Sequence, residues 1–376
     1  MQWPELPHFH TCQENAVLAT RLSIEELSIP ATLDEPSAAD FIEMVAVRNA
    51  IEAGLLGSDA LACTPAELLP VYQSAEFEPK RIFVAKVDGR TVGRSIMEWS
   101  IAEGTTSTWL VTEVLEEFRR RGIGSALFAT VEELAAASGR PTLQVEAMHT
   151  TTAGGERLPS PTGFGELPAA DPGVQFLTHR GYRLEQIERA SMVTLPMDRE
   201  ATEQALGAAL ASVDGSYSLV SWTGGTPQQW VPDIAVLRTR MSTDAPYAGL
   251  DVDEEPWDAA RIAHDDRTSS ADGRIRMTVA ARDDRTGQLV GFSELSIPAD
   301  RSRPAQQCDT LVLSEHRGHR LGMLLKLANL VDLHALSPLP PMVTTFNAEE
   351  NRHMLDVNEA LGFRAFGSAG CWRKVN

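Results

Sequence analysis

The chain has 376 residues and a mass of 40.9 kDa, which at roughly 150 residues per domain corresponds to about two domains. Hydrophobic residues make up 43% and charged residues 23%, which excludes global disorder, collagen and a disulfide scaffold. With 52 acidic against 33 basic side chains, the formal charge is −19. Such a charge repels phosphate backbones and attracts cationic small molecules, so we expect no nucleic-acid partner.

The N-terminal stretch, MQWPELPHFHTCQENAV, has neither the basic nor the apolar segment of a secretory signal. No apolar run approaches the ~20 residues that span a bilayer, so we expect a cytoplasmic protein with no membrane partner. Free thiols and no metal site are expected, because no C-x-x-C pair occurs. The four cysteines are Cys12, Cys63, Cys308 and Cys371.

In chain order, the first predicted element is a helix over residues 39–51, whose apolar residues show helical spacing. A second helix is predicted to begin at Pro65, because proline is favoured in the first turn of a helix. Residues 81–101 read as a β-hairpin with its turn at Asp88-Gly89. An apolar strand, a basic glycine-containing turn and a helix follow this hairpin.

A second hairpin, at residues 276–297, begins a repeat of the same order of elements. Gly93 and Arg119 are 26 residues apart, as are Gly291 and Arg317, and both pairs are offset by 198 residues. Two unrelated loops would rarely keep this register, which indicates a tandem duplication of one α/β domain. The predicted divisions are a domain at 1–198, an alanine-rich helical linker at 199–212 and a domain at 213–376.

The two halves differ in one long segment. From the basic turn to the terminal Gly-aromatic pair there are 62 residues in the first half, ending at Gly181-Tyr182, and 45 in the second, ending at Gly362-Phe363. The extra length falls in residues 149–173, which are rich in glycine, proline and threonine. This composition predicts a long loop, either a mobile one or a lid over a site.

The basic turns have residues suited to binding a diphosphate. In the first, Arg119 to Gly124 pass from a strand into a helix whose first amides lack partners and whose dipole favours an anion. Three arginines there add forked donors, and the glycines allow close approach. The second turn, His316 to Gly322, has Arg320 in place of one glycine. Two such turns in register favour diphosphate binding over ordinary surface corners, although neither has the Rossmann or Walker A pattern.

The R-x-x-G-x-G turn at Arg119 to Gly124, after the strand WLVTEVL, resembles the acyl-CoA pyrophosphate loop of the GNAT superfamily of N-acetyltransferases. The turn from Arg317 to Gly322 is similar, with Arg320 where the family usually has its first glycine. Residues 346–363, FNAEENRHMLDVNEALGF, resemble the later family motif, in which an asparagine precedes a helix ending in Gly-Phe. The two copies cover nearly the whole chain, similar to the tandem-domain actinobacterial acetyltransferases that include mycothiol synthase.

This resemblance implies an α/β (α+β) fold of two GNAT-like domains, each with a mixed, mostly antiparallel sheet flanked by helices and a splayed strand pair. It implies acetyl-CoA or another acyl-CoA as co-substrate, no metal, a small-molecule amine acceptor, and a monomer or homodimer. The residues that would hold the coenzyme are Val114, Leu115, Arg119, Arg120, Arg121, Gly122, Ile123, Gly124, Ser125, Val312, Leu313, Arg317, Gly318, His319, Arg320, Leu321, Gly322, Met323 and Asn351.

Acetyl transfer to an amine is direct attack, for which a carboxylate takes the proton of an ammonium substrate. The candidates in the second copy are Glu294 and Asp309, each of which could equally be the structural partner of an arginine. The family's general acid is a tyrosine seven residues after the motif asparagine, and Asn358 stands there; an amide can bond a thiolate but cannot protonate it. Tyr247 is a candidate acceptor-pocket residue or a core tyrosine.

Two functions stay open on this evidence. The first is an acyl-CoA-dependent N-acyltransferase that acetylates a primary amine of a small cationic molecule. The alternative is an acyl-CoA-binding regulatory or scaffold protein with one or both copies catalytically degenerate. The first copy has the more complete pyrophosphate turn and the analogous strand carboxylates Glu98 and Glu113. The second copy keeps the asparagine motif, which favours it for the chemistry, while coenzyme binding stays open for both.

Overall fold

The computed structural model describes residues 21–102, 104–150, 154–213 and 215–376. Cys12 lies outside these ranges, and the three other cysteines are free thiols. Within the described ranges, no helix is long and apolar enough to cross a membrane. The same ranges contain no group of three or more His, Cys, Asp or Glu placed to hold a metal ion.

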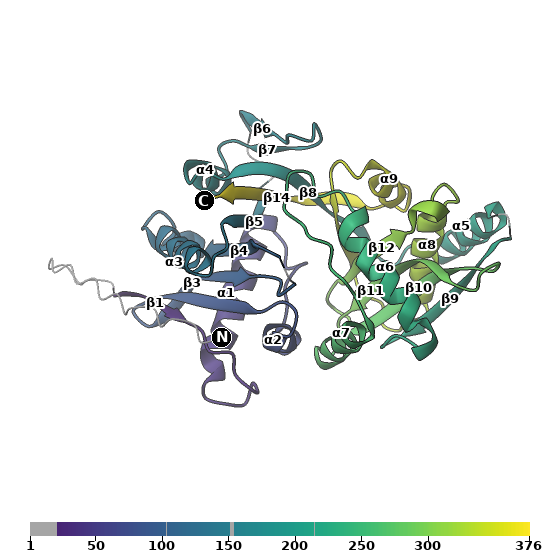
Figure 1. Ribbon diagram of the computed structural model, residues 1–376, viewed down its shortest axis with the longest axis horizontal. Coiled ribbons are helices and arrows are strands. Elements are labelled where there is room, and N and C mark those ends of the chain that lie inside the picture. The colour runs from purple at the N-terminus through teal and green to yellow at the C-terminus, as the bar shows by residue number, and fades with distance from the viewer. Residues whose placement is uncertain (1–20, 103, 151–153, 214) are drawn as a thin grey trace.

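The described residues form one 12-stranded sheet that runs through two lobes (Figure 1). All neighbouring strands are antiparallel except two pairs, β4–β5 and β12–β13. Across the sheet the order is β1 (Leu22–Glu26), β2 (Lys80–Val87), β3 (Arg90–Glu98), β4 (Ser107–Val114), β5 (Thr142–His149), β14 (Arg364–Val375), β8 (Arg183–Thr194), β13 (Met342–Ala348), β12 (Ala305–Val312), β11 (Leu289–Ile297), β10 (Ile275–Asp283) and β9 (Tyr217–Thr223).

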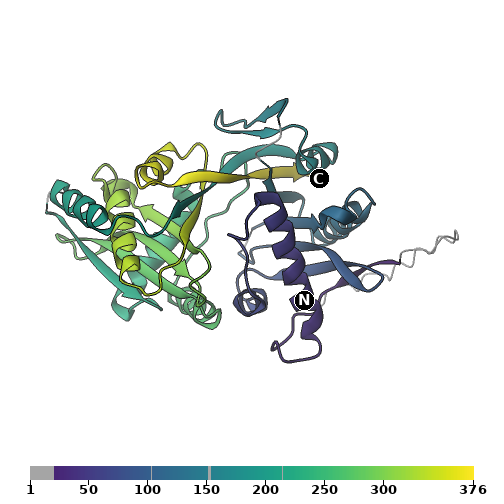
Figure 2. The same ribbon diagram turned by 180° about the vertical axis from the view of Figure 1, so that it is seen from behind.

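Helices cover both faces of this sheet. Figure 2 shows α1 in front of the first lobe and α8 in front of the second, because the twist of the sheet turns its faces over between the lobes. Face A carries α3 (Ile123–Ala137), α4 (Pro172–His179), α5 (Arg199–Ser212), α8 (Leu321–His334) and α9 (Arg352–Ala360). Face B carries α1 (Ala38–Leu56), α2 (Pro65–Gln73), α6 (Val231–Asp244) and α7 (Ala259–Ala271).

The last strand of the chain completes the sheet of the first lobe. β14 pairs with β5 through Ser368–Val375, and it pairs with β8 on its other side. β8 in turn pairs with β13 of the second lobe through Glu188–Thr194. Figures 1 and 2 show β8 and β14 extending from one lobe to the other. The lobes therefore share strands.

Trp372 of β14 anchors this exchange in the core of the first lobe. It is 1% exposed, and its Nε1 donates to His149 Nε2 at 3.3 Å. Because that nitrogen accepts, the proton of the imidazole is on Nδ1, which lies 2.9 Å from Asp171 Oδ1. Asp171 also accepts from the first amides of α4. Burial alone would raise the pKa of Asp171, but its bonds from His149 and the backbone lower it to about 2.

A second contact between the lobes is ionic. Glu67, in the capping box that begins α2, accepts from Arg274 at 2.9 Å and from Arg303 at 2.7 Å. Farther along, His264 of α7 lies 2.6 Å from the Ser74 hydroxyl. Helix α2 of the first lobe is therefore held to the second lobe by charge-assisted bonds in addition to the shared strands.

Several elements predicted from the sequence are present in the structure. The helix predicted over residues 39–51 is α1, and Pro65 begins α2. The predicted linker helix is α5, but it packs on α8 as part of the second lobe's core. The long segment at 149–173 contains a small hairpin of β6 (Arg157–Pro159) and β7 (Glu166–Pro168).

The repeated glycines have a shared steric cause. A Cβ on Gly93 would lie 2.7 Å from the Glu113 carbonyl oxygen, and one on Gly291 would lie 2.8 Å from that of Leu311. At Gly93, β3 lies very close to the end of β4, and at Gly291, β11 lies very close to the end of β12. Only glycine fits this approach, so the same residue recurs at the same place in both lobes.

Candidate active site

Each lobe has one pair of parallel strands that separates. β4 and β5 are paired only over Ser107–Leu110 and Thr142–Val145, so the later part of β4 has a free edge toward β5. β12 and β13 are paired only at Ala305 and Gln306 of β12. We call these gaps the first splay and the second splay. The splayed strand pair predicted for each domain is confirmed.

The first basic turn lies at the end of β4 and is open. Gly122 has φ 81° and precedes α3 with no side chain capping the helix. A Cβ on Gly122 would meet no atom within 4 Å. Arg119 folds back onto β4, where its Nε donates to the Val114 carbonyl at 2.9 Å. The first amides of α3 are thus accessible to an anion, so this turn fits the coenzyme's pyrophosphate.

The second basic turn has the same backbone but different side-chain contacts. Arg320 adopts φ 58° before α8, a left-handed conformation that glycine takes at lower cost. Arg317 repeats the bond of Arg119 by donating to the Val312 carbonyl at 3.1 Å. Its guanidinium also pairs with Asp244 at 2.7 Å. Part of the positive charge of this turn is therefore already neutralised within the second lobe.

Glu294 and Asp309, the carboxylates predicted as bases in the second lobe, both bind one arginine. Arg238 of α6 donates to each of them, and its guanidinium lies over the rings of Trp257 and Phe292. Burial alone would lower the pKa of Arg238, but the two carboxylates raise it above its usual value. Of the two roles considered for these carboxylates, this geometry favours the arginine partner.

Asn351, predicted to hold the coenzyme, and Asn358, at the position of the family's general acid, both have partners within the protein. Asn351 caps α9 by accepting from the Met354 amide at 3.3 Å. Asn358 is 1% exposed; its Oδ1 accepts from Lys326 Nζ and its Nδ2 donates to Asn347, both at 2.7 Å. Lys326 is equally buried, and burial lowers its pKa to about 7. Asn358 thus belongs to a polar network that joins α8, α9 and β13.

Tyr247 lies on face B, in the segment at 245–258 that passes between the lobes. Burial raises its pKa to about 12, and the nearby charges of Asp309, Glu255 and Glu188 add to the rise. The structure therefore brings Tyr247 close to one predicted carboxylate, Asp309. It also brings it close to Glu188 of β8, which the sequence analysis did not single out.

Two carboxylates beside the first splay stand out because they have no cation. Glu146 follows Val145, the last residue of β5 that pairs with β4, and Glu188 lies on the same face across β14. Among the described residues, neither side chain has a hydrogen bond or ion pair. Burial raises the pKa of both, that of Glu188 to about 7, and the charge of Glu146 adds to the rise at Glu188. In the sequence, Glu146 interrupts an apolar strand, a signal that could have identified it.

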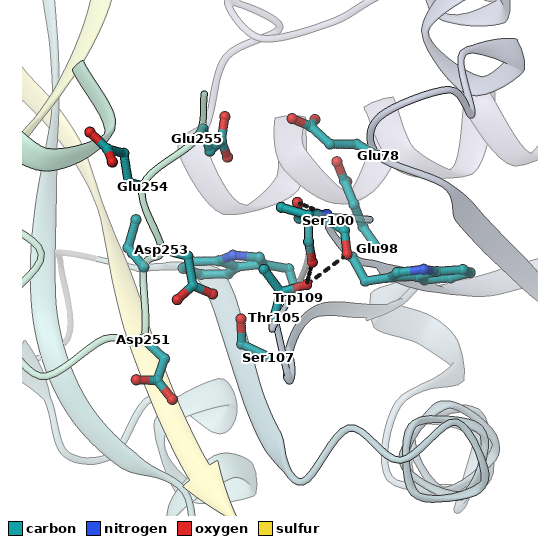
Figure 3. A pocket seen from close by; sticks show the side chains of 13 residues that line it. Glu78, Glu98, Ser100, Thr105, Ser107, Trp109, Asp251, Asp253, Glu254 and Glu255 are labelled. Atoms are coloured by element: carbon teal, nitrogen blue, oxygen red, sulfur yellow. Dashed lines mark hydrogen bonds between the residues drawn. The ribbon is translucent and has the colours of Figure 1, made fainter. Parts of the chain in front are cut away.

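An acidic pocket of about 200 Å³ lies between the lobes (Figure 3). Glu98 and Trp109 come from the face B side of β3 and β4, and the segment at 251–255 comes from the second lobe. Figure 3 shows carboxylates of both lobes around one space. The charged and aromatic lining residues are Glu78, Glu98, Trp99, Trp109, Asp251, Asp253, Glu254 and Glu255.

The pocket adjoins the first splay. Asp251, in its lining, donates its amide to Gln144 Oε1 at 2.7 Å and accepts from Gln144 Nε2 through its carbonyl at 3.0 Å. Gln144 and Glu146 share a face of β5 and are two residues apart, which is roughly 7 Å along a strand. A molecule in the pocket would thus reach the point where β4 and β5 separate. Burial raises the pKa of Glu98 there, despite its ion pair with Lys80.

Comparison with known proteins agrees with this geometry. Residues 78–156 match the acetyltransferase (GNAT) domain family. A tandem GNAT protein from the clavulanic acid biosynthesis pathway is 25% identical, with a TM-score of 0.70 over 94% of this chain and 98% of that chain. No curated protein matches the sequence.

Two further solved structures share the fold at lower identity. A GCN5-related N-acetyltransferase from Sphaerobacter thermophilus has a TM-score of 0.61 at 12% identity, over 96% of this chain and 97% of that one. A putative acetyltransferase from Pyrococcus horikoshii has a TM-score of 0.53 at 11% identity, over 98% and 94%.

Residues 78–156, in the first lobe, are therefore an acetyltransferase (GNAT) domain, and the chain as a whole is similar in fold to a tandem GNAT protein. This fold is one that binds acetyl-CoA. The family and fold predicted from the sequence are confirmed.

Proposed function

We propose that the protein transfers an acetyl group from acetyl-CoA to a primary amine of a small cationic molecule, and that the transfer takes place at the first splay. One observation carries this proposal: the two sides of that splay have opposite electrostatic character. An open, arginine-rich helix N-terminus lies at the end of β4. On face B lie the acidic pocket and two carboxylates without a cation. The first suits a diphosphate and the second suits an ammonium group.

The residues of the first lobe would divide the work. Arg119 to Ser125 would hold the pyrophosphate, and the free edge at Val111–Val114 would pair with the pantetheine arm like an added strand. The acceptor's ammonium gives one proton to a carboxylate, and the neutral amine then attacks the thioester carbon. A C–N bond forms as the C–S bond breaks, and the leaving thiolate takes the second proton of the nitrogen.

For the second lobe, the structure favours the scaffold alternative. Arg238 lies on the face B side of the second splay and forms ion pairs with the two carboxylates that could otherwise bind a cationic acceptor. A cationic substrate would have to compete with a guanidinium held by two carboxylates and two aromatic rings. The second lobe would then support the first through the shared strands and supply the 251–255 wall of the pocket.

A matched pair of substitutions tests this division. Gly124→Asp and Gly322→Asp place a carboxylate in the first turn of α3 or α8, where the helix dipole tolerates it but a diphosphate does not. Neither added Cβ meets an atom closer than 3.6 Å. We expect Gly124→Asp to reduce thiol release with a panel of amines by about 100-fold or more, and Gly322→Asp to change it little.

The opposite pattern would move the transfer to the second lobe. No thiol release by the wild-type protein with any amine, together with tight acetyl-CoA binding in calorimetry, would favour the regulatory or scaffold alternative. Within an active protein, Glu98→Gln combined with Glu255→Gln should raise KM for di- and polyamines more than for monoamines, because it removes two negative charges from the pocket lining.

A further inference from the structure

Helix α1 crosses the first splay on face B. Met44, near its start, lies over β3, where its Sδ is 3.8 Å from Arg94 NH1. Leu56, its last residue, lies over β14, where its Cδ2 would be 2.8 Å from a Cβ on Gly367. The helix also contacts β4 and β5, and Figure 2 shows it lying across these strands. Glu52 is one turn before Leu56, and it lies close enough to Glu113 of β4 and Glu146 of β5 for both charges to affect it.

One carboxylate oxygen of Glu52 has no hydrogen-bond partner among the described residues. Its side chain is 12% exposed, and one carboxylate oxygen, Oε1, pairs with Arg48 at 2.8 Å. The other, Oε2, is buried and has no hydrogen-bond donor among the described residues. A buried carboxylate oxygen without a donor is rare and costly, and such groups often mark a place where a ligand or a proton binds.

The groups facing Glu52 come from both strands of the splay. They are Glu113 on β4, Glu146 on β5, Arg94 on β3 and Arg48 on the same helix. Arg94 is held away by its own ion pair with Glu113 at 2.6 Å. Burial raises the pKa of Glu52 to about 7; Glu113 and Glu146 add to the rise, whereas the two arginines oppose it. A carboxylate of this kind is half ionised near neutral pH and can both accept and release a proton.

We propose that Glu52 is the general base of the first splay, with Oε2 accepting the proton from the acceptor's ammonium group before the amine attacks. The inference rests on the proposed function and gives it a specific catalytic residue. Glu146 and Glu188 attract the ammonium from solvent, and Glu52, beside the gap between β4 and β5, deprotonates it. The proton passes from Glu52 to water after the acetylated product leaves, which restores the carboxylate.

The test compares kcat as a function of pH for the wild type, Glu52→Gln and Glu52→Asp. A base works only when ionised, so wild-type kcat should rise with pH through about 7. Glu52→Gln should lower kcat at neutral pH by about 100-fold and abolish this rise. Glu52→Asp keeps the carboxylate but shortens its reach, so it should keep the rise at a lower kcat. This second variant stays informative should the glutamine protein fail to fold.

A matched control lies on the same helix. Glu43 accepts from Thr91 Oγ1 at 2.6 Å and is nine residues, roughly 13 Å, from Glu52 along the helix, so Glu43→Gln should keep the wild-type pH profile. An active Glu52→Gln protein with the wild-type kcat and the same rise would overturn the assignment of Glu52 while leaving the proposed function intact. A wild type that acetylates no amine would instead remove the proposed function and this inference with it.

Discussion

The two lobes repeat one fold but use the carboxylates on face B in different ways. Beside the first splay, Glu146 and Glu188 have no cation among the described residues, and their pKa values are raised. Beside the second splay, Glu294 and Asp309 are bound to Arg238. Both copies of the duplicated site therefore keep carboxylates, but in the second lobe an arginine of the protein occupies the position that a cationic ligand would take. This difference favours binding by the first lobe and a supporting role for the second.

The two lobes also differ at equivalent positions of the helices on face A. Phe128 of α3 and Lys326 of α8 occupy positions 198 residues apart, the offset of the repeat. Phe128 packs edge-to-face with Phe176 and Tyr182, with ring centroids 5.5 Å apart in each pair. Lys326 instead bonds Asn358 and has no carboxylate partner among the described residues. The first lobe closes this space with aromatic rings, and the second with a buried amine.

The largest effect on stability is expected at Trp372 of β14, the strand that completes the sheet of the first lobe. Trp372→Ala removes a fully buried indole from the first lobe and should lower the free energy of unfolding by about 3–5 kcal/mol. Because β14 belongs to a sheet shared by both lobes, urea unfolding should stay a single transition at a lower midpoint. Trp372→Phe, which loses mainly the bond to His149, should cost about 1 kcal/mol. Two separate transitions would show that the lobes fold independently.

Removing the internal cation of the second lobe should have a comparable cost. Arg238→Met leaves Asp309 without its cation and leaves the buried Glu294 with only the more distant Arg276, at 3.8 Å, so we expect a loss of about 3–5 kcal/mol in chemical denaturation. Adding Glu294→Gln and Asp309→Asn to the same protein should recover most of this loss, because no unpaired charge then remains. A single variant as stable as the wild type would contradict the view that Arg238 fills this site.

Making the second lobe more like the first should stabilise the protein. Lys326→Met removes a buried amine whose pKa is about 7 when folded, against about 10.4 unfolded. Between these pH values the unfolded chain binds more protons, so wild-type stability should rise from pH 7 to pH 10. The variant should lack this rise and gain about 2–4 kcal/mol at pH 7. Thermal unfolding across this pH range measures both effects.

The smallest effect concerns acid stability of the first lobe. The folded pKa of Asp171 is about 2, below the unfolded value of about 3.9. Its contribution, about 2 kcal/mol, is present above pH 4 and is lost as the pH falls through 2. Asp171→Asn should therefore flatten the acid limb of the stability curve between pH 4 and pH 2. An unchanged limb would mean that this carboxylate titrates normally.

Much of the first lobe's loop and strand framework could be predicted because its signals are local. Gly93, the Arg119 turn and the helix after it lie within one short stretch, and each has a steric or electrostatic reason to recur in the other half. The predicted bases illustrate the limit. Glu294 and Asp309 were recognised as strand carboxylates, but their partner Arg238 lies on a helix more than fifty residues away. Nothing near them in the chain distinguishes a base from half of an ion pair.

The sequence by itself determined the duplication, the two basic turns and the helices that follow them, since periodicity, glycine placement and charge act over a few residues. Only the tertiary structure decided which lobe each late strand joins, because a strand such as β14 has the same alternating pattern whichever neighbours it pairs with. Three-dimensional packing likewise decided which carboxylates meet a cation. Burial and neighbouring charge set the protonation of Glu52, Glu146 and Lys326, and both arise only when distant segments of the chain come together.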